Sequence, residues 1–176
     1  MSVLTAVACI LPLLACALEP ERATPAPSEA ADARGAATDG AAMEVSRSAA
    51  RAPARGPDAW FTGVVTITPL FNPKAQSKVS AALVRFEPGA RTAWHKHPLG
   101  QRLVVLEGSG WTQVEGGPIE AIRAGDVIWC PPDVRHWHGA TPTSSMAHIA
   151  IQEAENGSPV EWMEHVPDDH YGNGPA

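Results

Sequence analysis

The 176-residue chain has room for one ordinary domain and a tail, and its formal net charge is −6. A chain with this net negative charge gives no sign of a basic face for nucleic acid. Acidic and basic residues are interspersed, so no run of like charges indicates a charged partner. Of the three cysteines, Cys9 and Cys16 lie in an apolar N-terminal stretch, which leaves Cys130 without a partner for a disulfide inside the domain. We interpret Cys130 as a small buried apolar residue.

Residues 1–18 are expected to be a signal peptide or a lipoprotein signal. The apolar run 3–18 is too short for a stable membrane span and is typical of the core of an export signal. Leu13-Leu14-Ala15-Cys16 approximates a bacterial lipoprotein cleavage box, in which Cys16 would carry the lipid. The expected location is therefore the periplasm or cell envelope, with a possible membrane tether through Cys16. A buried N-terminal helix or a misassigned start codon is the alternative.

Residues 19–57 are expected to form a disordered linker. The segment consists mainly of Ala, Pro, Arg, Ser, Gly and Asp, with almost no large apolar side chain. Such a segment cannot bury enough surface to offset the entropy of ordering. A linker of this kind suits a domain tethered at a membrane surface.

The folded domain is expected over residues 58–172 and is predicted to be all-β. Short segments rich in β-branched and aromatic residues are separated by Gly and Pro, which indicates a β-sandwich or barrel. A Gly-Ser-Gly turn at 108–110 is expected to separate two of the strands. The predicted strands are 64–68, 79–87, 92–97, 102–107, 111–115, 118–123, 126–129, 136–139 and 146–153.

Four residues in the middle of the domain have the spacing of metal ligands. His95 and His97 point to the same side of a strand because side chains alternate between faces. After a Pro-Leu-Gly turn, Gln101 can bring an amide oxygen to the same point, and His136 can come from a second strand. The alternative is four unrelated polar residues, each with its own hydrogen bond. The His-x-His pair, and the glycines and prolines that flank the histidine segments, favour a metal site.

The predicted donor set of three imidazoles and one amide is neutral, so a divalent ion would keep its full charge and act as a strong Lewis acid. Nitrogen and oxygen donors suit manganese, iron, cobalt, nickel or zinc, and donor type does not choose among them.

Two further histidines are candidates for a general base. His138 shares the strand face of His136, and His148 lies on a polar face with Ala150 and Gln152, opposite an apolar face. A polar face of this kind indicates a strand that lines a cavity. The alternatives are an orienting partner of a ligand for His138 and a hydrogen-bonded structural role for His148.

The chain has six tryptophans and only one tyrosine. Four of the tryptophans lie within or between the segments that carry the histidines. They are expected to pack in the core and barrel wall, or one or two could wall a pocket for an apolar substrate. These four are Trp94, Trp111, Trp129 and Trp137.

The histidine segments resemble the two motifs of the cupin family. The first motif corresponds to Gly89, His95, His97, Gln101 and Gly108, with Gln in place of the usual Glu. The second corresponds to Gly125, Pro131, Asp133, His136 and Ala140, with Asp in place of Gly and Ala in place of Asn. From about Trp60 to Tyr171 the chain is similar to small single-domain cupins that act as manganese-dependent hydroxynitrile lyases.

This resemblance implies a cupin jelly-roll β-barrel. It implies manganese as the metal, with iron next, and a lyase that cleaves or forms cyanohydrins or a related small hydroxy or carbonyl compound. It also favours His138 or His148 beside the metal as the base. The alternatives are a cupin dioxygenase that uses iron or manganese and a non-enzymatic cupin that binds a metal or ligand at the cell surface. A homo-oligomer, dimer or tetramer, is expected because single-domain cupins often cover a barrel face with a partner and strand 64–68 suits edge pairing.

Overall fold

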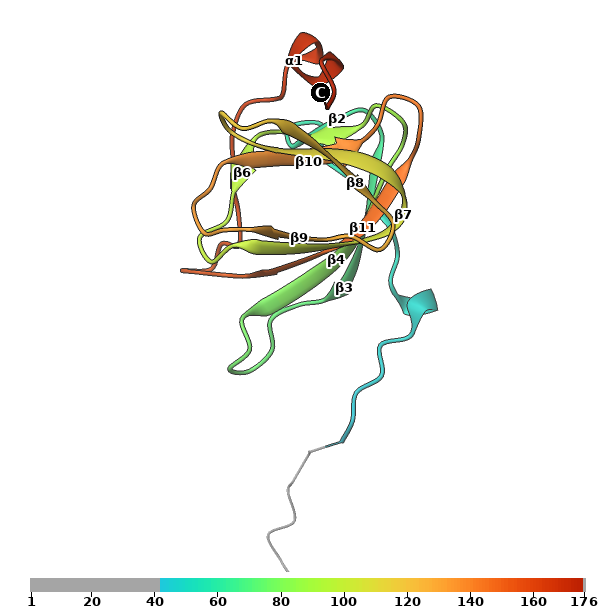
Figure 1. Ribbon diagram of the computed structural model, residues 1–176. Coiled ribbons are helices and arrows are strands. Elements are labelled where there is room, and N and C mark those ends of the chain that lie inside the picture. Colours follow the sequence, from blue (N-terminus) through green and yellow to red (C-terminus); the bar gives the residue numbers. More distant parts are fainter. Residues whose placement is uncertain (1–41, 176) are drawn as a thin grey trace, which may run out of the picture. The chain divides into compact units, whose positions relative to one another are not determined.

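Twelve strands and two short helices make up the computed structural model, which describes residues 42–175 (Figure 1). The expected export signal, with Cys9 and Cys16, and most of the expected linker lie outside the described residues. Within this range no helix is long and apolar enough to cross a membrane. The elements are η1 (Ser48–Ala50), β1 (Ala54–Arg55), β2 (Phe61–Thr62), β3 (Val65–Phe71), β4 (Val79–Phe86), β5 (Arg91–Thr92), β6 (His95–Lys96), β7 (Gln101–Val114), β8 (Ile119–Arg123), β9 (Val127–Cys130), β10 (His136–Ala140), β11 (Met146–Glu153), β12 (Glu161–Trp162) and α1 (Asp168–Gly172).

The strands form two antiparallel sheets that curl around a common interior, which confirms the all-β prediction (Figure 1). Sheet 1 contains β1, β3, β4, β11, the first half of β7 and β9. Sheet 2 contains the second half of β7 with β8, β10, β5, β2, β6 and β12. Strand β7 is therefore shared by both sheets.

The turn predicted at residues 108–110 is wrong, because β7 continues through it as one strand of 14 residues. Gly108 has a φ of +73°, and a Cβ built on it would lie 1.8 Å from the carbonyl oxygen of Ser145. Glycine is required here for both reasons. The glycines thus let one strand bend from sheet 1 into sheet 2.

The predicted strand 92–97 is interrupted and forms the two-residue strands β5 and β6. The break follows from the partners of the residues between them. The backbone of Ala93 donates to Trp60, and Trp94 exchanges backbone hydrogen bonds with Met163 and Glu164 at the C-terminal end of the chain. His95 therefore lies in β6, whereas His97 lies just beyond it.

Sheet 1 extends into the segment expected to be a linker. Ala54 and Arg55 form β1 and pair with Ile67 and Thr66 of β3. Over the described residues, the outermost strand of this sheet is thus β1 and not β3. Because β1 covers only Thr66 and Ile67 of β3, both the edge pairing and the oligomer stay predictions.

The C-terminal segment is fastened across sheet 2. Strand β12 pairs with β6, so Trp162 is the register partner of His95. The hydroxyl of Tyr171 donates to the carbonyl of Ala140 at 2.8 Å, and the buried Arg91 donates to the carbonyl of Val166 at 2.8 Å. These contacts hold the C-terminal segment against sheet 2, with β12 beside β6, the strand that carries His95.

The predicted packing role of the tryptophans is confirmed for Trp94 and Trp137, which are buried in a cluster with Val166 and Tyr171. Trp129 is 47% exposed on the outer face of sheet 1. Cys130 is free and buried, as expected, and burial raises the pKa of its thiol to about 12.

Candidate metal centre and active site

Five histidines gather in the interior between the two sheets, and all five are at most 3% exposed. His95 and His136 are register partners on β6 and β10, with ring centroids 4.3 Å apart. His138 follows on β10, and His148 faces it from β11 at a ring distance of 4.8 Å. His97 lies 5.2 Å from His95, measured between ring centroids. The barrel therefore brings together every histidine that the sequence singled out for the site.

Three of these rings are held in one orientation by backbone carbonyls. The Nδ1 atoms of His95, His97 and His136 lie 3.0, 2.7 and 2.9 Å from the carbonyls of Ala93, Pro159 and Val134. A carbonyl can only accept, so each Nδ1 carries the proton and each Nε2 keeps its lone pair. The Nε2 atoms of His97 and His136 are buried and have no partner among the described residues. Rings fixed in this way are typical of metal ligands.

Gln101 offers an oxygen to the same interior. Its Nε2 donates to Oε1 of Gln152 at 2.8 Å, while its own Oε1 is buried and has no partner in the described part of the chain. The two residues are register partners on β7 and β11. Unpartnered buried acceptors are costly unless a ligand satisfies them. These buried acceptors therefore fit a divalent cation, and the donor set of His95, His97, Gln101 and His136 stays a prediction.

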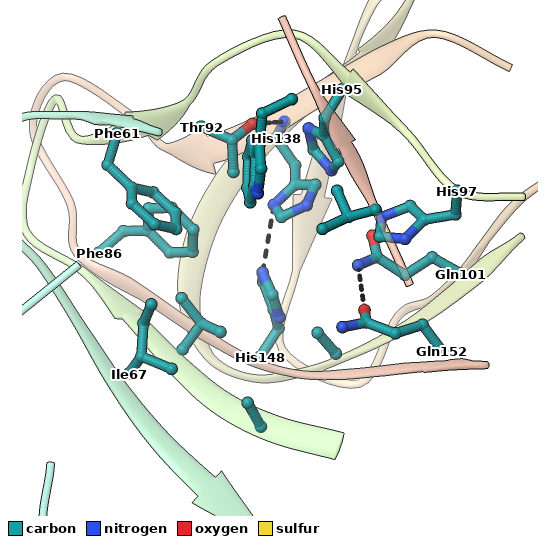
Figure 2. Close-up of a pocket in the computed structure, with 15 residues that line it drawn as sticks. Phe61, Ile67, Phe86, Thr92, His95, His97, Gln101, His138, His148 and Gln152 are labelled. Atoms are coloured by element: carbon teal, nitrogen blue, oxygen red, sulfur yellow. Dashed lines mark hydrogen bonds between the residues drawn. The ribbon is translucent and has the colours of Figure 1, made fainter. Parts of the chain in front are cut away.

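His138 and His148 differ from these three rings because they bond to each other. Nε2 of His148 lies 3.2 Å from Nδ1 of His138, and the backbone N–H of His138 donates to the hydroxyl of Thr92 at 3.1 Å (Figure 2). Nε2 of His138 and Nδ1 of His148 have no partner among the described residues. A ring-to-ring bond allows either tautomer of the pair, which suits proton transfer.

His138 also lies close to two of the rings that carbonyls orient. One ring nitrogen from each of His95, His136 and His138 lies within 4.8 Å of the others. The ring of His138 therefore lies at the centre itself and not behind it. This position suits a group that acts on a molecule bound at the metal.

Burial lowers the pKa of each of these rings because desolvation disfavours the charged form. It lowers the pKa of His97 and His148 to about 4, and it lowers the pKa of His136. The pKa values of His95 and His138 fall well below the usual range, first through burial and then through neighbouring imidazoles. All five rings are thus neutral at neutral pH, which is the state that binds a metal or accepts a proton.

A cavity of about 120 Å³ opens beside these histidines. Figure 2 shows Phe61, Phe86 and Ile67 at one end, His97, Gln101 and Gln152 at the other, and His138 and His148 between them. The predicted polar face of β11 is confirmed, since His148, Ala150 and Gln152 all line the cavity. It can hold a small molecule with an apolar body and one polar end.

The walls of this cavity include residues that the sequence did not single out for the site. Trp162 lines it and stacks on Trp60 with ring centroids 5.3 Å apart and planes within 5°, and Phe61 meets Trp162 edge to face. Phe61, Phe86 and Trp162 thus form the aromatic wall, and none of the four tryptophans considered for this role lines this cavity. The cupin-like motifs do not reach Trp162, and the pairing of β12 with β6 places it beside His95.

A barrel whose paired motifs deliver His-x-His, Gln and a third His to one buried centre defines a cupin. The family model of the cupin domain matches residues 82–151. The chain is also 55% identical over 129 residues to an (R)-mandelonitrile lyase from Granulicella tundricola, covering 73% of this chain and 98% of the relative. The chain belongs to the cupin family, as its motifs indicated.

Solved structures agree with this fold. A cupin-like protein from Thermotoga maritima is 38% identical with a TM-score of 0.66, and the match covers 69% of this chain and 92% of the other. A polyketide cyclase from Streptomyces resistomycificus is 19% identical with a TM-score of 0.59, over 74% of this chain and 91% of that protein, and shows similarity of fold alone.

Proposed function

We propose that the protein is a metal-dependent lyase that cleaves or forms cyanohydrins, in the manner that its relative's name implies. The observation that carries this proposal is the juxtaposition of a four-donor centre and a hydrogen-bonded His138–His148 pair in one apolar-walled cavity. The 55% identity to an (R)-mandelonitrile lyase supports the same reaction class.

Manganese is the metal we propose, with iron next. His95, His97, Gln101 and His136 would hold it, and a bound divalent ion would supply Lewis acidity toward a substrate oxygen or a leaving anion. The donors carry no charge, which preserves the positive charge of the ion. The amide of Gln101, where the family pattern has Glu, is the reason for this neutrality.

The cavity favours an aromatic or apolar α-hydroxynitrile. Phe61, Phe86 and Trp162 provide flat apolar walls for the body of the molecule. The hydroxyl and nitrile would then lie at the polar end among the histidines. Closely spaced aromatic rings exclude water from the reacting carbon and strengthen the polar contacts there.

The reaction needs one proton acceptor and one leaving group. Nε2 of His138 would accept the proton of the substrate hydroxyl, the oxygen electrons would form the carbonyl, and the bond to the nitrile carbon would break. The cyanide leaves with that electron pair and can take the same proton as hydrogen cyanide. His148 holds the His138 ring, and while Nε2 of His138 carries the substrate proton, the proton on Nδ1 of His138 can shift to Nε2 of His148 and return when cyanide is protonated.

The test is an assay of the purified, metal-analysed protein against a panel of aromatic and aliphatic cyanohydrins under air and under anaerobic conditions. We expect metal-dependent release of aldehyde and cyanide that does not depend on oxygen. Turnover that requires oxygen would support a dioxygenase instead, and metal binding without turnover of any cyanohydrin would support a binding protein.

A further inference from the structure

A second pocket adjoins the cavity that holds the histidines, and one side chain borders both spaces. Val160 lines this inner cavity and also the outer pocket, which has a volume of about 280 Å³. His97 lines the inner cavity, whereas Lys96 and Pro98, its neighbours in the chain, line the outer pocket. The two spaces therefore lie on opposite sides of the segment that carries His97, and they meet at Val160.

The inner cavity retains solvent exposure along one rim. Its histidines and Gln101 are buried. The lining residues that keep partial exposure are Ile67, Ala82, Gln152, Val160 and Trp162. Val160 directly follows Pro159, whose carbonyl accepts a hydrogen bond from Nδ1 of His97 at 2.7 Å. The rim residue that borders both spaces is thus joined to the residue that orients a proposed metal donor.

The outer pocket has a net negative lining. Its walls include the carboxylates of Asp133, Glu155 and Glu161 and the ammonium group of Lys96. Nζ of Lys96 lies 3.2 Å from Glu161 and 3.7 Å from Asp133, so this single cation compensates the three carboxylates only in part. The other rim residues of the inner cavity carry no charge. A divalent cation is therefore attracted to the outer pocket more than to the rest of the rim.

On the inner side of Val160, two buried acceptors are ready for a cation. Nε2 of His97 and Oε1 of Gln101 have no partner among the described residues. An ion that passes Val160 can exchange its water for these donors at once. It does not have to cross the apolar end of the cavity, where an unpaired charge is costly.

The main chain around Val160 is held in place. Oγ of Ser158 donates to the carbonyl of Val160 at 2.9 Å, and Glu161 begins β12, which pairs with β6. The hydrogen bond between Pro159 and His97 holds the same segment from the inner side. The width of the passage between the two spaces therefore depends on the side chain of Val160.

We propose that the divalent cation enters and leaves the centre through the outer pocket, and that the side chain of Val160 sets the rate of this exchange. The proposal rests on the metal centre of the proposed function and not on the reaction. A side chain that only obstructs a path changes the barrier by the same amount in both directions. Its size should therefore change the rates of uptake and release by one factor and leave the Kd unchanged.

Stopped-flow kinetics of the full chain test this proposal. Quenching of tryptophan fluorescence reports uptake of manganese(II) by the metal-free protein, since Trp162 lies 4.8 Å from the ring of His95. Mixing of the loaded protein with excess EDTA gives the release rate. We expect Val160→Ala to accelerate both processes about 10-fold and Val160→Ile to slow both, with a Kd within about two-fold of the parent.

The matched control is Ile67→Ala, because Ile67 lies on the same rim but does not line the outer pocket. We expect parent-like exchange rates for this variant, and circular dichroism checks that all variants fold. Equal acceleration by Ile67→Ala would place the route across the open rim and overturn the proposal. A changed Kd with an unchanged uptake rate in Val160→Ala would also overturn it, because Val160 would then support His97 and not obstruct a path.

Charge reversal tests the outer pocket itself. Glu155 is exposed there, and Glu155→Lys should slow uptake several-fold at low ionic strength and have little effect at high salt. An unchanged uptake rate at low ionic strength would overturn the outer pocket as the route. A parent that takes up no manganese would overturn the centre and the route together. Absence of cyanohydrin turnover with the expected exchange rates would overturn the proposed reaction alone.

Discussion

The side-chain amide of Gln101 is held by Gln152. Nε2 of Gln101 donates to Oε1 of Gln152 at 2.8 Å, and an amide with its nitrogen fixed in this way must direct its oxygen elsewhere. That oxygen is buried and has no partner within residues 42–175. Gln152 thus selects which atom of Gln101 is offered to a cation, although Gln152 itself is not among the four expected donors.

We expect Gln152→Leu to weaken manganese binding by about 10–100-fold, because the amide of Gln101 can then rotate away. Competition with a chelator of known affinity measures this directly. If Gln152 acts through Gln101, the same substitution in a Gln101→Leu background should have almost no further effect. Equal losses in both backgrounds would show that Gln152 acts by another route.

Removal of an imidazole donor should have a larger effect. His95→Ala and His136→Ala are each expected to weaken binding by more than roughly 100-fold, since each leaves three of the four donors. The barrel should still fold, because neither substitution alters the apolar core cluster that includes Val65, Phe86, Leu103 and Met146. Metal content after dialysis, together with far-ultraviolet circular dichroism, checks both statements. Stoichiometric metal in either purified variant would contradict the donor assignment.

Loss of the base should remove turnover but not the metal. We expect His138→Ala and His148→Ala to lower kcat by on the order of 10²–10⁴-fold on a cyanohydrin, with metal content unchanged. The comparison must be made at full manganese occupancy. Parent-like rates in both variants would exclude the pair as the base and with it the proposed mechanism.

Gln101→Glu should differ from a base variant in its effects on metal affinity and Lewis acidity. It adds a negative donor, which raises affinity for a divalent ion and lowers its Lewis acidity, while the His138–His148 contact is untouched. We expect equal or tighter manganese binding and a lower kcat, with the pH dependence of kcat unchanged. A shifted pH profile would show that Gln101 is coupled to the proton-transfer step.

The metal-free protein should lose stability as the pH falls. Burial lowers the folded-state pKa of His97 and His148 from 6.5 to about 4, so the unfolded chain binds more protons than the folded chain between these values. The contribution of these two rings to the free energy of unfolding is therefore fully present above about pH 6.5 and is lost as the pH falls towards 4. A folded-state pKa that lies one pH unit lower corresponds to about 1.4 kcal/mol of stability at neutral pH. We expect the Tm to fall by roughly 10 °C or more between pH 7.5 and 5 in calorimetry, and a flat profile would contradict neutral buried rings.

The motifs predicted which histidines gather in the interior and the polar face of β11, because these depend on strand alternation, which spacing reveals. The division of residues 101–114 into two strands failed because glycines mark both turns and bends, and only the partner strands distinguish them. Trp162 as a wall of the site and the hydrogen bond between Gln152 and Gln101 were not predicted for a related reason. Their positions depend on pairing with β6 and β7, which lie far away in the sequence.

The carbonyl of Pro159 and the pairing of Trp162 with His95 have a consequence for the order in which the centre is built. A chain emerging from the ribosome presents His95, His97, Gln101 and His136 before these last residues exist. Until they arrive, the ring of His97 can rotate and His95 lacks its neighbouring strand. Tight capture of a cation by these residues is therefore expected only at the end of folding, once the C-terminal segment is in place.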